Sequence, residues 1–69
     1  MRTHLVSASD GEYNEEVEFC GTLYECQQFI AKEKAHFDGW VEETDPGETW
    51  AFHLSPTKTF YRTIEEIKA

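Results

Sequence analysis

Residues 20–40 constrain the fold of this chain more than any other stretch, because they encode one helix together with its start and its end. Thr22 and Glu25 form a T-x-x-E capping box, in which the Thr22 hydroxyl accepts a backbone N–H and the Glu25 carboxylate accepts the N–H of the cap residue. The pair Asp38-Gly39 offers a left-handed glycine, at which many helices stop. These residues therefore predict a helix over residues 22–37.

One side of the predicted helix is apolar. At 100° per residue its apolar side chains fall on one narrow stripe, which is typical of a helix packed against a core. The stripe contains Leu23, Cys26, Ile30 and Phe37, with Phe29 on its flank. The basic residues of the last turns lie where the helix dipole favours cations, so they do not by themselves indicate nucleic-acid contact.

Two segments before the helix predict a β-hairpin. Residues 3–8 are rich in β-compatible side chains and run into the turn dipeptide Asp10-Gly11. Between residues 13 and 19 the apolar Tyr13, Val17 and Phe19 alternate with polar side chains, as in a strand with one buried face.

The segments after the helix predict a second hairpin and a fifth strand. Residues 40–44 precede Asp45-Pro46-Gly47-Glu48, which suits a type II turn, and residues 50–54 then alternate between apolar and polar. Residues 58–65 are rich in β-branched and aromatic side chains, so we favour a strand there. A helix is the alternative, because the apolar residues of this segment also have helical spacing.

These elements predict a two-layer α+β domain over residues 1–69. A chain of 69 residues can form one hydrophobic core and is too short for two domains. The expected order is strand, strand, helix, strand, strand, strand, with an antiparallel sheet of four or five strands and the helix on one face. The strand residues expected to face the helix are Tyr13, Val17, Phe19, Trp50, Phe52 and Leu54.

The sheet face away from the helix is the candidate functional surface. Period-two alternation places alternate residues of the second and fourth strands there, Ala51 among them, and neighbouring strands add others. The candidate binding residues are Glu16, Glu18, Glu42, Glu43, His53 and Tyr61. Such an acidic surface suits a basic protein partner, and an ordinary solvated sheet face is the alternative.

The chain is strongly acidic. Fourteen acidic residues against six basic ones give a formal charge of −8. This charge argues against direct binding to nucleic acid or to an anionic membrane, because both depend on neutralising phosphates. It favours a larger protein with a basic surface as partner, although acidity also keeps a small protein soluble. Two cysteines are too few for the disulfide framework of a secreted small protein, so we expect a cytoplasmic protein.

The sequence carries no specific pattern for catalysis, metal or cofactor binding. Cys20 and Cys26 are spaced C-x5-C, whereas structural zinc sites usually have C-x2-4-C or close histidine pairs. Carboxylates are numerous without any one being singled out, and neither a G-x-S-x-G elbow nor a glycine-rich phosphate loop is found. We therefore expect a protein that is not an enzyme and that uses neither a metal nor a cofactor.

Three short motifs carry a resemblance in layout: Gly21-Thr22, Ala31-Lys32-Glu33 and Gly39. With the strands around them, residues 16–64 resemble some small phage-encoded proteins, including certain anti-CRISPR proteins of five strands and one helix. The resemblance implies an anti-defence inhibitor that acts in the host cytoplasm by occluding a host protein complex. No binding residues carry over from that group, because this chain has no basic patch for nucleic acid.

Three functions remain open on the sequence. The first, which we favour, is a small acidic non-enzymatic binding protein that occludes a basic site on a larger protein, a nucleic-acid-binding site being one such case. The second is a structural or assembly subunit that forms a homo-oligomer such as a homodimer. The third is a direct mimic of nucleic-acid phosphates.

Overall fold

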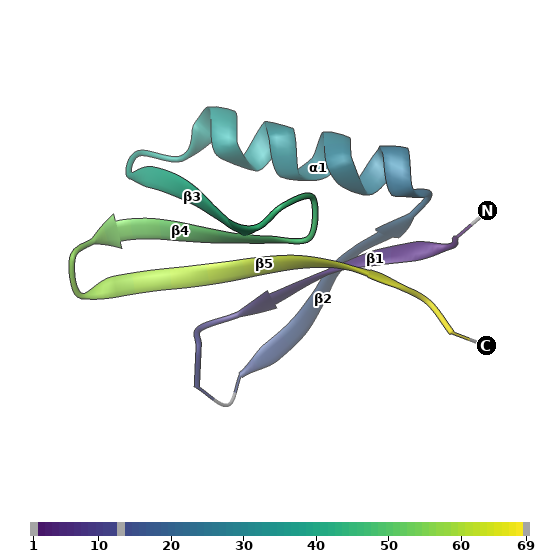
Figure 1. Cartoon of the computed structure of the whole chain (residues 1–69), viewed down its shortest axis with the longest axis horizontal. Coiled ribbons are helices and arrows are strands. Elements are labelled where there is room, and N and C mark those ends of the chain that lie inside the picture. Colours follow the sequence, from purple (N-terminus) through teal and green to yellow (C-terminus); the bar gives the residue numbers. More distant parts are fainter. Residues whose placement is uncertain (1, 13, 69) are drawn as a thin grey trace.

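The computed structural model describes residues 2–12 and 14–68, in which five strands and one helix follow each other in the predicted order (Figure 1). The strands are β1 (His4–Ser9), β2 (Glu15–Gly21), β3 (Trp40–Asp45), β4 (Thr49–Ser55) and β5 (Lys58–Glu66), and the helix α1 covers Leu23–His36. The two-layer α+β fold is thus confirmed, with five strands rather than four. Residues 58–65, for which the sequence favoured a strand and allowed a helix as the alternative, lie in the strand β5. Tyr13, expected to face the helix, lies outside the described residues.

All neighbouring strands of the sheet are antiparallel, and their order is β2-β1-β5-β4-β3. The last strand, β5, therefore occupies the centre, where it pairs with both β1 and β4. In Figure 1 it crosses the middle of the sheet while the helix lies over one face. β2 and β3 form the two edges.

The start of α1 follows the prediction. The backbone N–H of Glu25 donates to the Thr22 hydroxyl at 3.1 Å, and the N–H of Thr22 donates to the Glu25 carboxylate at 2.9 Å. This reciprocal capping box satisfies two backbone donors that the first turn would otherwise leave without partners.

The end of α1 differs from the prediction. The helix is capped by Phe37, whose backbone is extended (φ −86°, ψ 132°), and Gly39 is not among the described glycines with positive φ. Gly39 is required for another reason, since a Cβ atom at this position would collide with the carbonyl oxygen of His53 on β4. The glycine therefore allows close backbone approach rather than a left-handed turn.

The turn between β3 and β4 is as expected. The N–H of Glu48 donates to the Asp45 carbonyl at 2.9 Å, and Gly47 has φ of +73°, the left-handed value that the third position of a type II turn requires.

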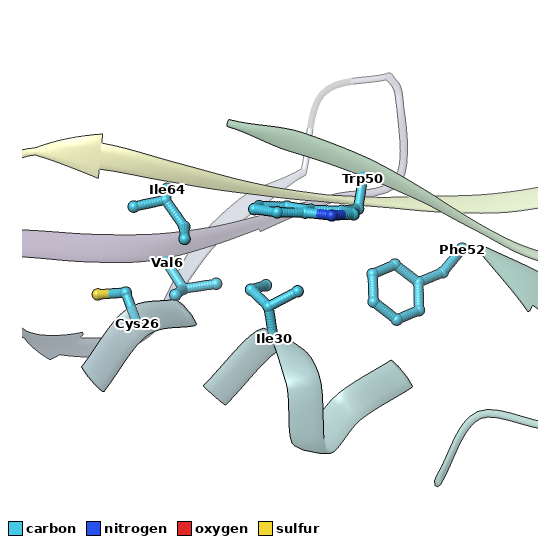
Figure 2. Packing of buried hydrophobic residues seen from close by; sticks show 6 residues of the cluster. All are labelled: Val6, Cys26, Ile30, Trp50, Phe52 and Ile64. Atoms are coloured by element: carbon cyan, nitrogen blue, oxygen red, sulfur yellow. The ribbon is translucent and has the colours of Figure 1, made fainter. Parts of the chain in front are cut away.

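The core lies between α1 and the sheet. Figure 2 shows Cys26 and Ile30 of the helix directed toward side chains of β1, β4 and β5. The buried cluster is Val6, Cys26, Ile30, Trp50, Phe52 and Ile64, with Phe19, Phe29, Phe37, Val41 and Phe60 packed around it. Two aromatic pairs extend it: Phe19 stacks on Phe29 with ring centroids 5.0 Å apart, and Phe37 meets Phe52 edge-on at 5.2 Å.

Three residues assigned to the core by their spacing are largely exposed: Val17 at 58%, Leu54 at 49% and Leu23 at 42%. Leu23 opens the helix, and Leu54 lies at an irregularity in the pairing of β4 with β5. Val17 is displaced by a β-bulge, because Val6 pairs with Phe19 while the next residue of β1, Ser7, pairs with Val17. Glu18 is the extra residue of this bulge, and it reverses the face on which the first half of β2 presents its side chains.

Candidate functional site

The six predicted site residues divide between the two faces of the sheet. Paired residues of neighbouring strands share a face, and successive residues of a strand alternate between faces. Since Trp50 and Phe52 face the helix, Ala51 and His53 face away from it, as predicted. Ala51 pairs with Glu42 and with Tyr61, so these two also lie on the face away from α1.

The placement of the two β2 carboxylates was wrong. Val6 is in the core, so Ala8 also lies on the helix side, and Ala8 pairs with Glu16. Glu18, in the bulge, reaches Arg62, which pairs with Ala8 and Trp50 on the same side. Both acids are thus on the helix side of the sheet.

Glu43 also lies on the helix side, because it pairs with Trp50. Its carboxylate accepts the N–H of Gly47 at 2.9 Å, so part of its hydrogen-bonding capacity is used by the β3–β4 turn. Of the two candidate residues on β3, Glu42 and Glu43, only Glu42 lies on the predicted face.

We use the term open face for the sheet surface opposite α1, which consists of four rows of paired residues. The first row is Val17, Ser7, Thr63, Thr49 and Asp45; the second is Glu15, Ser9, Tyr61, Ala51 and Glu42; the third is Thr59, His53 and Trp40; the fourth is Cys20, Leu5 and Glu65. Contrary to the prediction of an acidic surface, the carboxylates stand at the ends of the rows: Glu15, Glu42 and Asp45 on the edge strands, and Glu65 near the C-terminal end of β5. The middle of the open face carries hydroxyl and aromatic side chains.

His53 is the most constrained side chain of the open face. Its Nδ1 lies 3.0 Å from the Thr59 hydroxyl and its Nε2 lies 3.3 Å from a Glu42 carboxylate oxygen. Its ring stacks on the indole of Trp40, with centroids 5.0 Å apart and planes inclined by 14°. Carboxylate, imidazole and hydroxyl also occur in this order in catalytic triads, but here they lie on a sheet surface, and the hollows described below are lined by other residues. The contacts fix the orientation of the ring.

Trp40 was not among the predicted site residues, although it is the large aromatic side chain that stands out on the open face, at 52% exposed. The sequence did contain a pattern that could have identified it. Trp40 and Glu42 are two residues apart in one predicted strand, and residues at this spacing point to the same face of a sheet. Assigning Glu42 to the open face therefore assigns Trp40 to it as well.

A groove opens on the helix side of the β1–β2 hairpin, where the displaced acids lie. It encloses about 210 Å³ and is lined by Ala8, Ser9, Asp10, Asn14, Glu16, Glu18, Phe60 and Arg62. We call it the hairpin groove. Its wall combines three carboxylates, one aromatic ring and one cation.

Asp10 is held in place within the hairpin groove. Its carboxylate accepts the N–H of Glu12 at 2.9 Å and the side-chain amide of Asn14 at 3.0 Å. These hydrogen bonds, the one from the Glu12 backbone foremost, lower the pKa of Asp10 below its usual value. The carboxylate is therefore ionised at neutral pH.

Arg62 neutralises part of this acidic wall. Its Nε lies 2.8 Å from Oε1 of Glu18 and 3.3 Å from Oε1 of Glu33 on α1, and neither contact is an aligned hydrogen bond of that N–H. Another guanidinium nitrogen donates to the carbonyl of Tyr61 at 3.1 Å, and the group lies 5.7 Å from the Phe52 ring centroid. Burial raises the pKa of Glu33, Arg62 opposes this rise, and the Glu18 carboxylate adds to it.

Two further hollows follow the helix on its exposed flank. One of about 230 Å³ is lined by Phe19, Tyr24, Glu25, Gln28, Phe29 and Lys32. The other, of about 420 Å³, is lined by Phe29, Lys32, Glu33, His36 and Phe37. The second is lined by Glu33 and the hairpin groove by Glu18 and Arg62, so both border the Glu18–Arg62–Glu33 cluster.

The two thiols are free, Cys20 half-buried and Cys26 buried in the core, where burial raises the pKa of its thiol. Within residues 2–12 and 14–68, no three His, Cys, Asp or Glu side chains gather as they would around a metal ion. The helix in that same part of the chain is too short and too polar to cross a membrane.

No family model matches the chain, and neither a curated protein nor a solved structure is similar to it. The resemblance in layout to small phage-encoded proteins therefore stays an expectation.

Proposed function

We propose that this chain is a small acidic binding protein, without enzymatic activity, that docks on a basic site of a larger protein and blocks that site. The observation that carries the proposal is the distribution of charge over the sheet. Residues 4–21 and 40–55, which form the two hairpins, hold nine of the fourteen acidic residues and no lysine or arginine. Both edges of the sheet are thus acidic, and among the described residues Arg62 pairs with one of these nine acids, Glu18.

The edge strands themselves carry most of this charge. β2 contributes Glu15, Glu16 and Glu18, and β3 contributes Glu42, Glu43 and Asp45. Charged side chains on an edge strand oppose the addition of another strand. A partner is therefore expected to meet side chains here rather than to extend the sheet through backbone hydrogen bonds.

Within this acidic surface, the hairpin groove is the part best suited to a cationic side chain. Its carboxylates Asp10 and Glu16 have no ion pair among the described residues, and Glu18 already shares Arg62 with Glu33. The Phe60 ring adds an apolar wall on which the stem or the planar head of an arginine can pack. The groove therefore offers both charge and contact area to a basic residue of the partner.

Charge complementarity also determines how such a partner would bind. An acidic surface facing a basic one speeds the encounter, and salt screens the attraction over about 10 Å at about 0.1 M. If the basic site normally binds nucleic acid, occupation by this chain excludes it. Inhibition of a host-defence complex is the specific form of this proposal that the resemblance in layout favours.

The test uses a fluorescent nona-arginine peptide as a defined basic probe, titrated with the protein at about 50 mM and about 500 mM NaCl. Two variants have the same change of charge: Glu16→Lys in the hairpin groove, and Glu66→Lys at the opposite end of the sheet, where Glu66 pairs with His4. We expect Glu16→Lys to weaken binding by about tenfold at low salt and Glu66→Lys to weaken it by no more than about twofold. Affinity should fall steeply at high salt.

Two outcomes would contradict the proposal. One is equal loss in both variants, which would mean that only the overall charge attracts the peptide. The other is no measurable binding at low salt. A natural partner recovered from lysate should likewise be retained by Glu66→Lys and lost by Glu16→Lys.

A further inference from the structure

The open face carries a second surface that the acidic docking site does not use. α1 covers the opposite side of the sheet, and no described element lies over the open face (Figure 1). Its middle is uncharged: the carboxylates Glu15, Glu42 and Asp45 stand on the edge strands, and Glu65 lies near the C-terminal end of β5. An uncharged centre with aromatic side chains and a polar rim is the usual composition of a protein interface.

The exposed apolar groups of this face are held in place before any partner arrives. Trp40 is 52% exposed, and its ring is stacked on His53, which is fixed in turn by Thr59 and Glu42. Val17 is 58% exposed, because the bulge at Glu18 turns it to this side. Preorganised side chains lose little conformational entropy on association.

We propose that the open face is the site at which a second copy of this chain binds, forming a symmetric dimer by face-to-face packing of the two sheets. A two-fold interface brings identical groups together, so its centre must be self-complementary. Hydroxyl groups satisfy this condition because each can donate and accept, and the centre offers Thr49, Thr59, Tyr61 and Thr63.

Charge supports a second copy rather than a basic partner on this face. A basic partner gains most where carboxylates gather, and these are at the edges and in the hairpin groove. Two copies with a formal charge of −8 each repel one another wherever acidic surfaces meet. The middle of the open face is where they can approach without opposing carboxylates.

The size of the face is sufficient. The five strands are six to nine residues long and rise about 3.3 Å per residue, and neighbouring strands lie about 4.8 Å apart. These dimensions give a face of several hundred Å², the same order as the roughly 800 Å² that each partner contributes to a standard interface. Packed sheets lie about 10 Å apart, a distance that the stacked Trp40 and His53 rings can fill.

The test measures mass by sedimentation velocity from about 1 to about 200 μM protein, at about 50 mM and about 500 mM NaCl. We expect concentration-dependent formation of a species of twice the chain's mass, strengthened by salt because salt screens the repulsion between the two acidic copies. This dependence is opposite to that of the peptide binding described above, so the two proposals can fail independently.

Matched variants locate the interface. Val17→Glu places a carboxylate on the open face, and Gln27→Glu adds the same charge to an exposed position of α1 on the other side of the molecule. We expect Val17→Glu to raise the dimer dissociation constant by at least about tenfold and Gln27→Glu by less than about twofold. Nona-arginine binding should persist in Val17→Glu.

A second measurement on the wild type guards against a folding defect in the variant. Acrylamide quenches the fluorescence of exposed tryptophans, and Trp40 is 52% exposed whereas Trp50 is only 6% exposed. If quenching decreases as the protein concentration rises, Trp40 has become covered. A monomer at the highest concentration and salt would overturn the proposal. So would a dimer that leaves Trp40 accessible, or one weakened equally by both variants.

Discussion

The Nε atom of Arg62 lies 3.3 Å from Oε1 of Glu33, so an ion pair joins the central strand of the sheet to the inner side of the helix. The same nitrogen lies 2.8 Å from Oε1 of Glu18 on an edge strand. One cation thus serves two carboxylates, and all three side chains are less than one-third exposed. The stability of the helix–sheet packing should depend on this cation more than on either acid.

Replacing Arg62 by Met tests this dependence. Met retains an apolar stem beside the Phe52 ring and removes the charge, so Glu18 and Glu33 are left half-buried without a cation. We expect the free energy of unfolding to fall by about 2 kcal/mol, less than for a fully buried pair because solvent reaches these groups. Urea unfolding followed by tryptophan fluorescence measures the loss. The exposed Arg2→Met is the control, and an equal effect of the two changes would contradict the expectation.

The titration of Glu33 should give the protein a recognisable pH dependence. Burial raises the pKa of Glu33 above its usual 4.5, so folded molecules keep a proton on it that unfolded molecules have already lost. The contribution of Glu33 to stability therefore decreases as pH rises from the unfolded pKa through the raised folded value. We expect Glu33→Gln to gain stability relative to the wild type as pH rises above the usual 4.5, as measured by urea unfolding at each pH.

Glu25 provides the control of opposite sign. The N–H of Thr22 lowers the pKa of Glu25, so its stabilising contribution is present above 4.5 and is lost as pH falls through the lower folded value. Glu25→Gln should therefore be less stable than the wild type near neutral pH and should approach it on acidification. Two variants with parallel pH profiles would show that neither carboxyl titrates as described.

The elements of this fold were predictable because each is encoded locally. The capping box at Thr22 and the turn at Gly47 specify their own hydrogen bonds, and both form as expected. The order of strands in the sheet was not predictable in this way. The position of β5 between β1 and β4 depends on contacts such as Val6 with Ile64, which are far apart in the sequence.

The candidate site was harder to predict, because one inserted residue decides which way β2 presents its acids. Glu16, Val17 and Glu18 alternate regularly in sequence, and nothing in that pattern marks the bulge. The bulge follows from tertiary structure, since Phe19 must both pair with Val6 and stack on Phe29. The role of Glu33 was missed for a similar reason: it lies at the helical position three residues after Ile30, on the buried side, but its partner comes from β5.

The need for glycine at position 39 can be separated from the need for glycine in a turn. A Cβ atom at Gly39 would collide with the His53 carbonyl oxygen, a backbone atom of β4 that cannot move without disturbing the sheet. Gly47 has open space around it and only its positive φ disfavours other residues. We expect Gly47→Ala to lower the free energy of unfolding by about 1 kcal/mol and Gly39→Ala to lower it by considerably more. Urea midpoints in the reverse order would mean that the helix exit tolerates a wider separation from β4.

The helix itself offers a matched pair of truncations that tests where its core face lies. Ile30 is 2% exposed and lies among Val6, Trp50 and Phe52 (Figure 2), whereas Leu23 is 42% exposed at the first turn. Ile30→Ala removes buried contacts and leaves a cavity, so the free energy of unfolding should fall by about 3 kcal/mol, a large share of what so small a domain has. Leu23→Ala, the same kind of change in the same helix, should cost less than about 1 kcal/mol. If urea unfolding shows similar losses of unfolding free energy for the two variants, Leu23 belongs to the core, as its spacing in the sequence predicted.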